Sequence, residues 1–166
     1  MTAPEQARFP VGIVGTRDHY PDDEVLATIR RFGEKHPEGI VVVTGDAKGV
    51  DEIAAGWARA ENVPFIAEPA HWAEQGKAAG HERNARVVAR CSAVVAFFHP
   101  KPLVGLPTTS PGTCDAITQA RDRHIPVYAH HEARWLADGD LQRIADQVHQ
   151  KWARVGKAPE KQEDPG

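Results

Sequence analysis

Two glycine-containing segments of the sequence combine groups that can hold a phosphate or a ribose. One is Thr44-Gly45-Asp46-Ala47-Lys48-Gly49-Val50-Asp51 and the other is Gly112-Thr113-Cys114-Asp115. Glycines let backbone N–H groups approach phosphate oxygens, and a helix that starts behind such a loop adds its positive end. The first segment matches neither a Walker A loop nor the dinucleotide motif Gly-x-Gly-x-x-Gly. The alternative is that these glycines only turn the chain.

Charged side chains lie in or near these segments. Arg17 follows a predicted strand, and Arg83 lies near a predicted helix start. A guanidinium group can contact a phosphate or a carboxylate through two hydrogen bonds. Asp46, Asp51 and Asp115 could contact ribose hydroxyls or act as acids or bases, although Asp51 and Asp115 could equally cap helices.

Other kinds of catalytic centre find little support in the sequence. The nine histidines have no glutamate or cysteine companions at the spacing of metal ligands, so we predict neither a metal site nor a bound cofactor. Cys91 and Cys114 are expected to be small buried residues rather than nucleophiles. The chain shows no Ser-His-Asp or Cys-His arrangement that could be assigned.

Five short apolar segments, each followed by a helical pattern, provide the framework for these groups. The predicted strands cover residues 9–14, 40–43, 63–66, 93–98 and 125–128. Strands that alternate with helices predict an α/β, Rossmann-like fold, with a mostly parallel five-stranded sheet and helices on both faces. Parallel strands place the loops that follow them along one edge of the sheet. Arg17, the 45–51 loop and the 112–115 segment should therefore converge.

Length and composition restrict the classes of protein. With 166 residues and 41% hydrophobic content, the chain predicts a single domain over residues 1–155 and a disordered tail over 156–166. The net charge of −3, with acidic and basic residues interspersed, disfavours duplex nucleic acid and anionic membranes as partners. Neither a signal segment nor a membrane span is evident, so we expect a soluble cytoplasmic protein. The oligomeric state, including a homo-oligomer, stays open.

The motifs, taken in order, resemble the small stand-alone branch of the SLOG superfamily, the YspA-type, cpYpsA-related group. The blocks are Val14-Gly15-Thr16-Arg17, the 44–51 segment, Trp72 with the 76–80 segment, Arg83-Asn84, and Pro111-Gly112-Thr113-x-Asp115. The superfamily also contains the DprA and LOG proteins. The resemblance covers residues 11–128 and implies a Rossmann-like fold with a pocket for a nucleotide or a nucleotide-derived signal.

The resemblance and the residue types together define a predicted ligand site. Its members are Gly15, Thr16, Arg17, Gly45, Asp46, Lys48, Gly49, Asp51, Lys77, Arg83, Asn84, Gly112 and Thr113. Some members of the superfamily hydrolyse a nucleoside monophosphate and carry Gly-Thr-x-x-Glu. The matching position here is Ala116, and Asp115 lies one residue earlier.

Three functions follow from this comparison. The first is binding or sensing of a nucleotide-derived small molecule without turnover. The second is N-glycosidic hydrolysis of a nucleoside monophosphate, with Asp115 or Asp46 stabilising the oxocarbenium-like centre. The third is a DNA-binding accessory protein like DprA, which the acidic balance of the chain disfavours.

Overall fold

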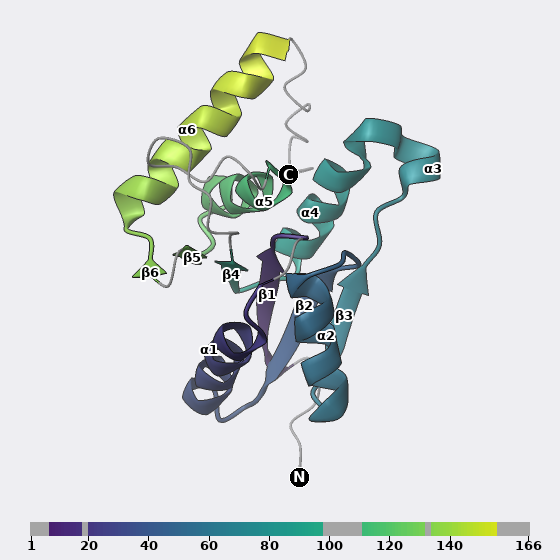
Figure 1. Ribbon diagram of the computed structural model, residues 1–166, viewed down its shortest axis with the longest axis vertical. Coiled ribbons are helices and arrows are strands. Elements are labelled where there is room, and N and C mark those ends of the chain that lie inside the picture. Colours follow the sequence, from purple (N-terminus) through teal and green to yellow (C-terminus); the bar gives the residue numbers. More distant parts are fainter. Residues whose placement is uncertain (1–6, 18–19, 98–110, 132–133, 156–166) are drawn as a thin grey trace.

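A six-stranded sheet forms the middle layer of the protein (Figure 1). This computed structural model describes residues 7–17, 20–97, 111–131 and 134–155. The strands lie in the order β3-β2-β1-β4-β5-β6. Their bounds are β1 Phe9–Gly15, β2 Ile40–Gly45, β3 Phe65–Glu68, β4 Ala93–Phe97, β5 Val127–His131 and β6 Arg134–Trp135. The first five strands pair in parallel, which confirms the predicted Rossmann-like α/β fold.

The predicted number of five strands is wrong by one. In β6, Arg134 pairs with His131 and Trp135 pairs with His130, both in antiparallel register. A strand of two residues is too short to produce an alternating pattern, so β6 could not be predicted from the sequence. The fifth predicted strand also starts later than expected, at Val127. The N–H group of Ile125 instead donates to the carbonyl of Ala120 at the end of the preceding helix.

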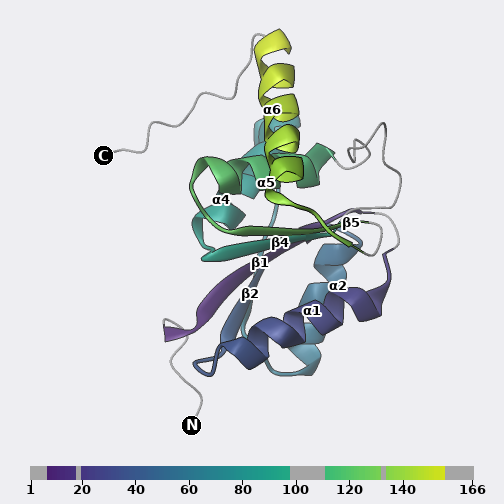
Figure 2. The same cartoon turned by 90° about the vertical axis from the view of Figure 1, so that its left-hand side faces the viewer.

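Helices cover both faces of the sheet (Figure 2). On one face lie α1 (Asp22–Lys35) and α2 (Val50–Ala60), and on the other lie α4 (Ala79–Ala89), α5 (Pro111–Asp122) and α6 (Asp138–Val155). The short helix α3 (Trp72–Gln75) and the 3₁₀ turn η2 (Gly76–Ala78) lead into α4. None of the helices in the described ranges has the length and apolar composition that crossing a bilayer requires.

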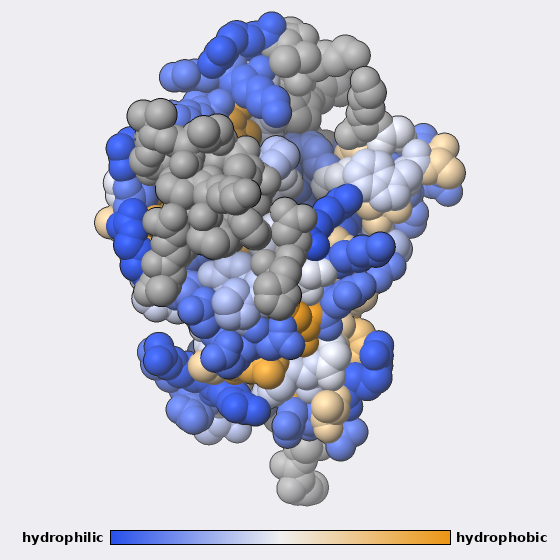
Figure 3. All heavy atoms as spheres, viewed as in Figure 1, coloured by the Kyte–Doolittle hydropathy of each residue, from blue (hydrophilic) through white to orange (hydrophobic). Residues whose placement is uncertain are grey.

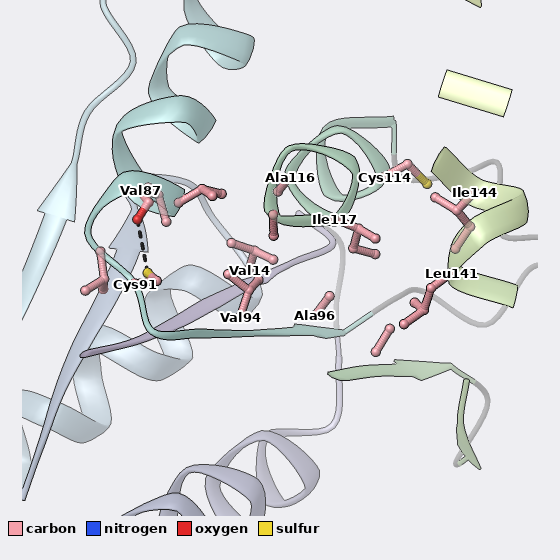
Figure 4. Packing of buried hydrophobic residues seen from close by; sticks show 14 of the residues in the cluster. Val14, Val87, Cys91, Val94, Ala96, Cys114, Ala116, Ile117, Leu141 and Ile144 are labelled. Carbon is pink, nitrogen blue, oxygen red and sulfur yellow. Dashed lines mark hydrogen bonds between the residues drawn. The ribbon is translucent and has the colours of Figure 1, made fainter. Parts of the chain in front are cut away.

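The strand β2 explains how two separate cores form. All six of its residues are buried. Side chains alternate between the faces of a strand, so Val41 and Val43 join the core beneath α4, α5 and α6, whereas Ile40 and Val42 join the core beneath α1 and α2. Figure 4 shows the first of these cores, in which side chains of β1 and β4 meet those of α5 and α6.

The described ranges leave some predictions untested. The end of the fourth predicted strand, Phe98, and the predicted tail over 156–166 lie outside the described residues. The prediction of a single domain over residues 1–155 therefore stays a prediction. The two glycine-containing segments do lie within the described residues. The first begins at the end of β2, which ends at Gly45, and the second lies in α5, which includes Gly112.

Candidate functional site

A pocket of about 310 Å³ lies at the carboxyl ends of β1, β2 and β3. The segments that follow β1, β2 and β3 contribute to its wall, as do the helices α3 and α4. The lining residues are Arg17, Asp46, Ala47, Lys48, Pro69, Ala70, Trp72 and Arg83. Three of these eight side chains are basic and one is acidic, so the wall favours an anionic ligand. The pocket is at the sheet edge where ligands bind in open α/β folds.

Close backbone contact positions Arg17 beside the start of α2. Gly49 has a φ of +79°, and a Cβ atom there would overlap the carbonyl oxygen of Thr16. The N–H group of Val50 donates to that same oxygen at 3.2 Å. The first N–H group of α2 is therefore used within the protein. Gly49 allows the segment after β1 to pack closely against the start of α2. Gly15 allows β1 to lie close to β4, since a Cβ there would lie 2.6 Å from the carbonyl oxygen of Phe97.

Gly45 makes room for two charged side chains. A Cβ atom at this position would lie 2.5 Å from Nη1 of Arg83 and 2.8 Å from Oδ2 of Asp51. A larger residue would have to displace the guanidinium group, which is the end of a flexible side chain. We expected the backbone of Gly45 to contact a phosphate. Instead, Gly45 provides space for the side chain of Arg83, which can bind a phosphate.

Arg83 is buried, and most of its donors have no hydrogen-bond partner among the described residues. Only 8% of its surface is exposed, yet it lines the pocket. Among the described residues, its guanidinium donates one hydrogen bond, from Nε to Oδ1 of Asn84 at 3.3 Å. Burial lowers the pKa of the guanidinium, but an arginine keeps its charge in proteins. The remaining N–H groups have no hydrogen-bond partner within the described ranges and can donate to an anion in the pocket.

Trp72 was missed as a site residue by the sequence analysis, although it was part of the motif pattern. Its side chain is 52% exposed and lines the pocket, and the guanidinium carbon of Arg17 lies 5.8 Å from the centre of its ring. An exposed indole beside a cation is a surface on which a nucleobase can stack. The signal in the sequence was a large aromatic residue between a proline-containing loop and a cation-rich helix.

Asp51 is a buried carboxyl group directly behind the pocket. Burial raises its pKa to about 7, while the charges of Arg83 and Arg17 and a backbone hydrogen bond with Ala47 act in the opposite direction. The helix α2 has no side-chain cap, and Asp51 is its second residue, so the capping interpretation is wrong for Asp51. A carboxyl group with this pKa changes between its protonated and ionised forms near neutral pH.

The buried carboxyl group should make stability depend on pH. The folded protein keeps the Asp51 proton after the unfolded chain has lost it, so the free energy of unfolding should fall as pH rises from about 4 through about 7. Asp51→Asn removes this contribution. Between about pH 5 and about pH 8, the free energy of unfolding measured with urea should fall by about 2 to 3 kcal/mol more for wild type than for the variant. Parallel pH profiles for the two proteins would contradict this assignment.

The predicted residues of the second segment lie beside the pocket rather than in its wall. Gly112, Thr113 and Asp115 all fall within α5, so Asp115 is not a helix cap. Nδ2 of Asn84 donates to the carbonyl of Gly112 at 3.0 Å and to Oδ2 of Asp115 at 2.9 Å. This segment is therefore connected to the pocket through Asn84 and Arg83. Thr113 is buried, with 5% of its surface exposed.

The structure thus divides the predicted site residues into groups. Arg17, Asp46, Lys48 and Arg83 line the pocket. A second group does not line the pocket but contacts the lining residues or the backbone that carries them. It consists of Gly15, Thr16, Gly45, Gly49, Asp51 and Asn84. Lys77 belongs to η2, but its side chain lies outside the described part of the structure. Within the described ranges there is no group of three or more histidine, cysteine, aspartate or glutamate residues that could hold a metal ion.

Comparisons with known proteins agree with the fold and the motifs. Residues 10–74 match the family model described as the "YspA, cpYpsA-related SLOG family", and this range includes the ends of β1, β2 and β3. This match confirms the resemblance to SLOG proteins over residues 10–74, and the motifs beyond Glu74 lie outside it. A search of curated proteins found no match.

A solved structure shares the fold at low sequence identity. It is the DNA processing protein A (DprA) from Streptococcus pneumoniae, with a TM-score of 0.56 and 16% identity over 87% of this chain and 56% of that one. This chain therefore spans just over half the length of that protein, and the likeness shows the fold alone. Since that protein's name refers to DNA processing, it gives no support to our expectation against nucleic acid, which stays a prediction.

Proposed function

We propose that the SLOG-like pocket binds a nucleotide or a nucleotide-derived small molecule. The observation that carries this proposal is the guanidinium of Arg83, which is buried in the pocket wall and donates to one other group among the described residues. A buried cation is costly unless a partner offsets its desolvation. The charges of Asp51 and Asp46 offset part of this cost, and a phosphate group would add the paired hydrogen bonds that Arg83 does not make with either carboxyl group in the described residues.

The remaining wall suits the other parts of such a ligand. The exposed ring of Trp72 offers a stacking surface for a base, and Arg17 and Lys48 add positive charge. The carboxylate of Asp46 can accept hydrogen bonds from ribose hydroxyls. A volume of about 310 Å³ is at the lower end of the range for small-molecule sites. Lys77, Gly112 and Thr113 remain proposed contributors on the basis of the family resemblance.

N-glycosidic hydrolysis is the second candidate, because the carboxylate of Asp46 lies in the pocket wall. A carboxylate there could stabilise an oxocarbenium-like centre at the ribose. Asp115, the other predicted catalytic residue, is held by side chains of α4 and α5 and does not belong to the wall. Binding without turnover is therefore the simpler function.

A panel of ligands tests the proposal by isothermal titration calorimetry. Nucleoside monophosphates should bind at least about tenfold more tightly than the matching nucleosides, because only the former can pair with Arg83. Equal affinity for both classes would contradict the proposed phosphate site. Release of free base that Asp46→Ala abolishes would establish hydrolysis instead. Single-stranded DNA forms a further arm, in which affinity that grows with length and falls steeply with salt would favour a nucleic-acid function.

A further inference from the structure

A chain of hydrogen bonds runs from the pocket to the interface between α4 and α5. Nε of Arg83 donates to Oδ1 of Asn84 at 3.3 Å, and Nδ2 of Asn84 donates to Oδ2 of Asp115 at 2.9 Å. The other oxygen of Asp115 lies 2.8 Å from Nδ1 of His81. We call these residues, together with Gln119, the Asn84 network.

The amide of Asn84 has one favourable orientation in this network. Its oxygen faces a cationic donor, while its nitrogen faces two acceptors, the carbonyl of Gly112 and the carboxylate of Asp115. A reversed amide would place NH₂ against the guanidinium and oxygen against the carboxylate. Asn84 is 6% exposed, so water cannot easily replace these partners. The orientation of Asn84 therefore depends on three partners, of which Asp115 contributes a side chain that lies outside the pocket wall.

Both oxygens of Asp115 are occupied by donors from the protein. Oδ1 pairs with His81, and Oδ2 accepts from Asn84 and from Nε2 of Gln119 at 2.9 Å. Nε2 of Gln119 also donates to the backbone carbonyl of His81 at 3.1 Å. Nε2 of Gln119 also lies 3.2 Å from Nδ1 of His81, but its two protons serve the two shorter bonds. The proton on Nδ1 of His81 is therefore directed to Asp115. Such a carboxylate has little capacity left for a substrate.

We propose that Asp115 and His81 are positioning residues that control ligand affinity by holding Asn84, and through it the guanidinium of Arg83, in place. The inference rests on the proposed function, since it concerns the affinity of the same pocket. It also gives Asp115 a role different from the catalytic one expected from the sequence.

The surroundings of His81 decide how this control depends on pH. Its hydrogen bond with Asp115 raises the pKa of the imidazole, burial lowers it, and the charge of Glu82 raises it. From α6, the ring of Trp152 packs edge-on at 5.2 Å between ring centres, and from α5 the uncharged Gln119 completes the environment. The ion pair is fully present below about pH 6.5 and is lost as pH rises through the raised pKa of the folded protein.

The test compares wild type with His81→Asn, which keeps a donor near the position of Nδ1 but cannot be charged. Affinity for adenosine 5′-monophosphate is measured by calorimetry at about pH 5.5 and about pH 9. The wild type should bind about tenfold more tightly than the variant at the lower pH, and about equally at the higher pH. Ionisation of the ligand and of Asp51 affects both proteins alike, so the ratio isolates His81.

Two further variants complete the design. Asp115→Asn removes the negative charge and leaves one amide N–H group facing the protonated His81, so we expect it to weaken binding by about tenfold at about pH 5.5 and by less at about pH 9, where a neutral imidazole can accept from that group. His36→Asn is the matched control, since His36 forms a similar 2.8 Å pair with Glu38 near the start of β2, at the opposite end of the strand from the pocket. Its affinity should equal that of wild type at both pH values.

A readout without ligand separates the two proposals. In the free protein, the Nε–H signal of Arg83 in NMR spectra should exchange with water faster in Asp115→Asn than in wild type. If wild type binds no nucleotide, the proposed function fails. The Nε–H signal of Arg83 then decides by itself whether Asp115 holds Asn84 and Arg83 in place. An Nε–H signal unaffected in Asp115→Asn, or nucleotide affinities of both network variants equal to wild type at both pH values, would overturn it.

Discussion

Arg83→Met should reduce the affinity for a nucleoside monophosphate by about a hundredfold, which corresponds to about 3 kcal/mol. Methionine keeps most of the length and the apolar stem of the side chain but loses the charge and every donor. The fold should survive the substitution, because the neighbouring carboxyl group of Asp51 can take up a proton near neutral pH when the opposing charge is removed. Calorimetric titration gives the affinity, and urea unfolding at the same pH gives the stability.

Arg90→Met is the matched control for this experiment. Arg90 directly follows the same helix, α4, but is 51% exposed at its side chain and pairs with Glu68 at 2.6 Å instead of lining the pocket. This variant should bind the nucleotide as wild type does. If Arg83→Met retained wild-type affinity, Arg83 could not be the phosphate-binding group.

Gly49→Ala should lower the free energy of unfolding by about 3 kcal/mol. The φ of +79° and ψ of −126° at Gly49 form a conformation that residues with a Cβ rarely adopt. The added atom would also overlap the carbonyl oxygen of Thr16 and lie 2.8 Å from the carbonyl carbon of Arg17. Both neighbours are backbone atoms, so relief requires separating the end of β1 from the start of α2. Ligand affinity should fall as well, because Arg17 moves with this backbone.

Gly56→Ala in the same helix provides the control. A Cβ atom at Gly56 would meet nothing within 4 Å, and alanine favours a helix by about 1 kcal/mol over glycine. This variant should therefore be slightly more stable than wild type in urea unfolding. A midpoint for Gly49→Ala equal to that of wild type would show that the two loops are not held together as described.

Much of the fold was predictable because it depends on local patterns. The run of β-branched residues in β2 is buried at every position, as a strand in the middle of a parallel sheet requires. Pro64 comes directly before β3, which lies at the edge of the sheet, and proline is found at such strand starts and edges. Parallel pairing then placed Arg17 and the 45–51 loop at one edge without further information. Among the strands in the described ranges, β6 has two residues and was the one without a recognisable pattern.

The internal arrangement of the site was less predictable, since it depends on side chains that meet across long separations. Asn84 and Asp115 are 31 residues apart, and nothing in their local sequence indicates that they share a hydrogen bond. The guanidinium group of Arg83, a residue of α4, occupies the space beside Gly45. The raised pKa of Asp51 likewise results from burial that the assembled fold creates.

The central claim, that a phosphate-bearing ligand occupies this pocket, is tested most directly by NMR titration of the labelled protein with adenosine 5′-monophosphate. The side-chain signals of Arg83 and Trp72 should shift together and saturate at one concentration. Trp135, which is 43% exposed but lies in β6 and not in the pocket wall, should stay unchanged and serves as the internal control. Saturable shifts elsewhere with Arg83 and Trp72 unmoved, or no saturable shifts at all, would contradict the account.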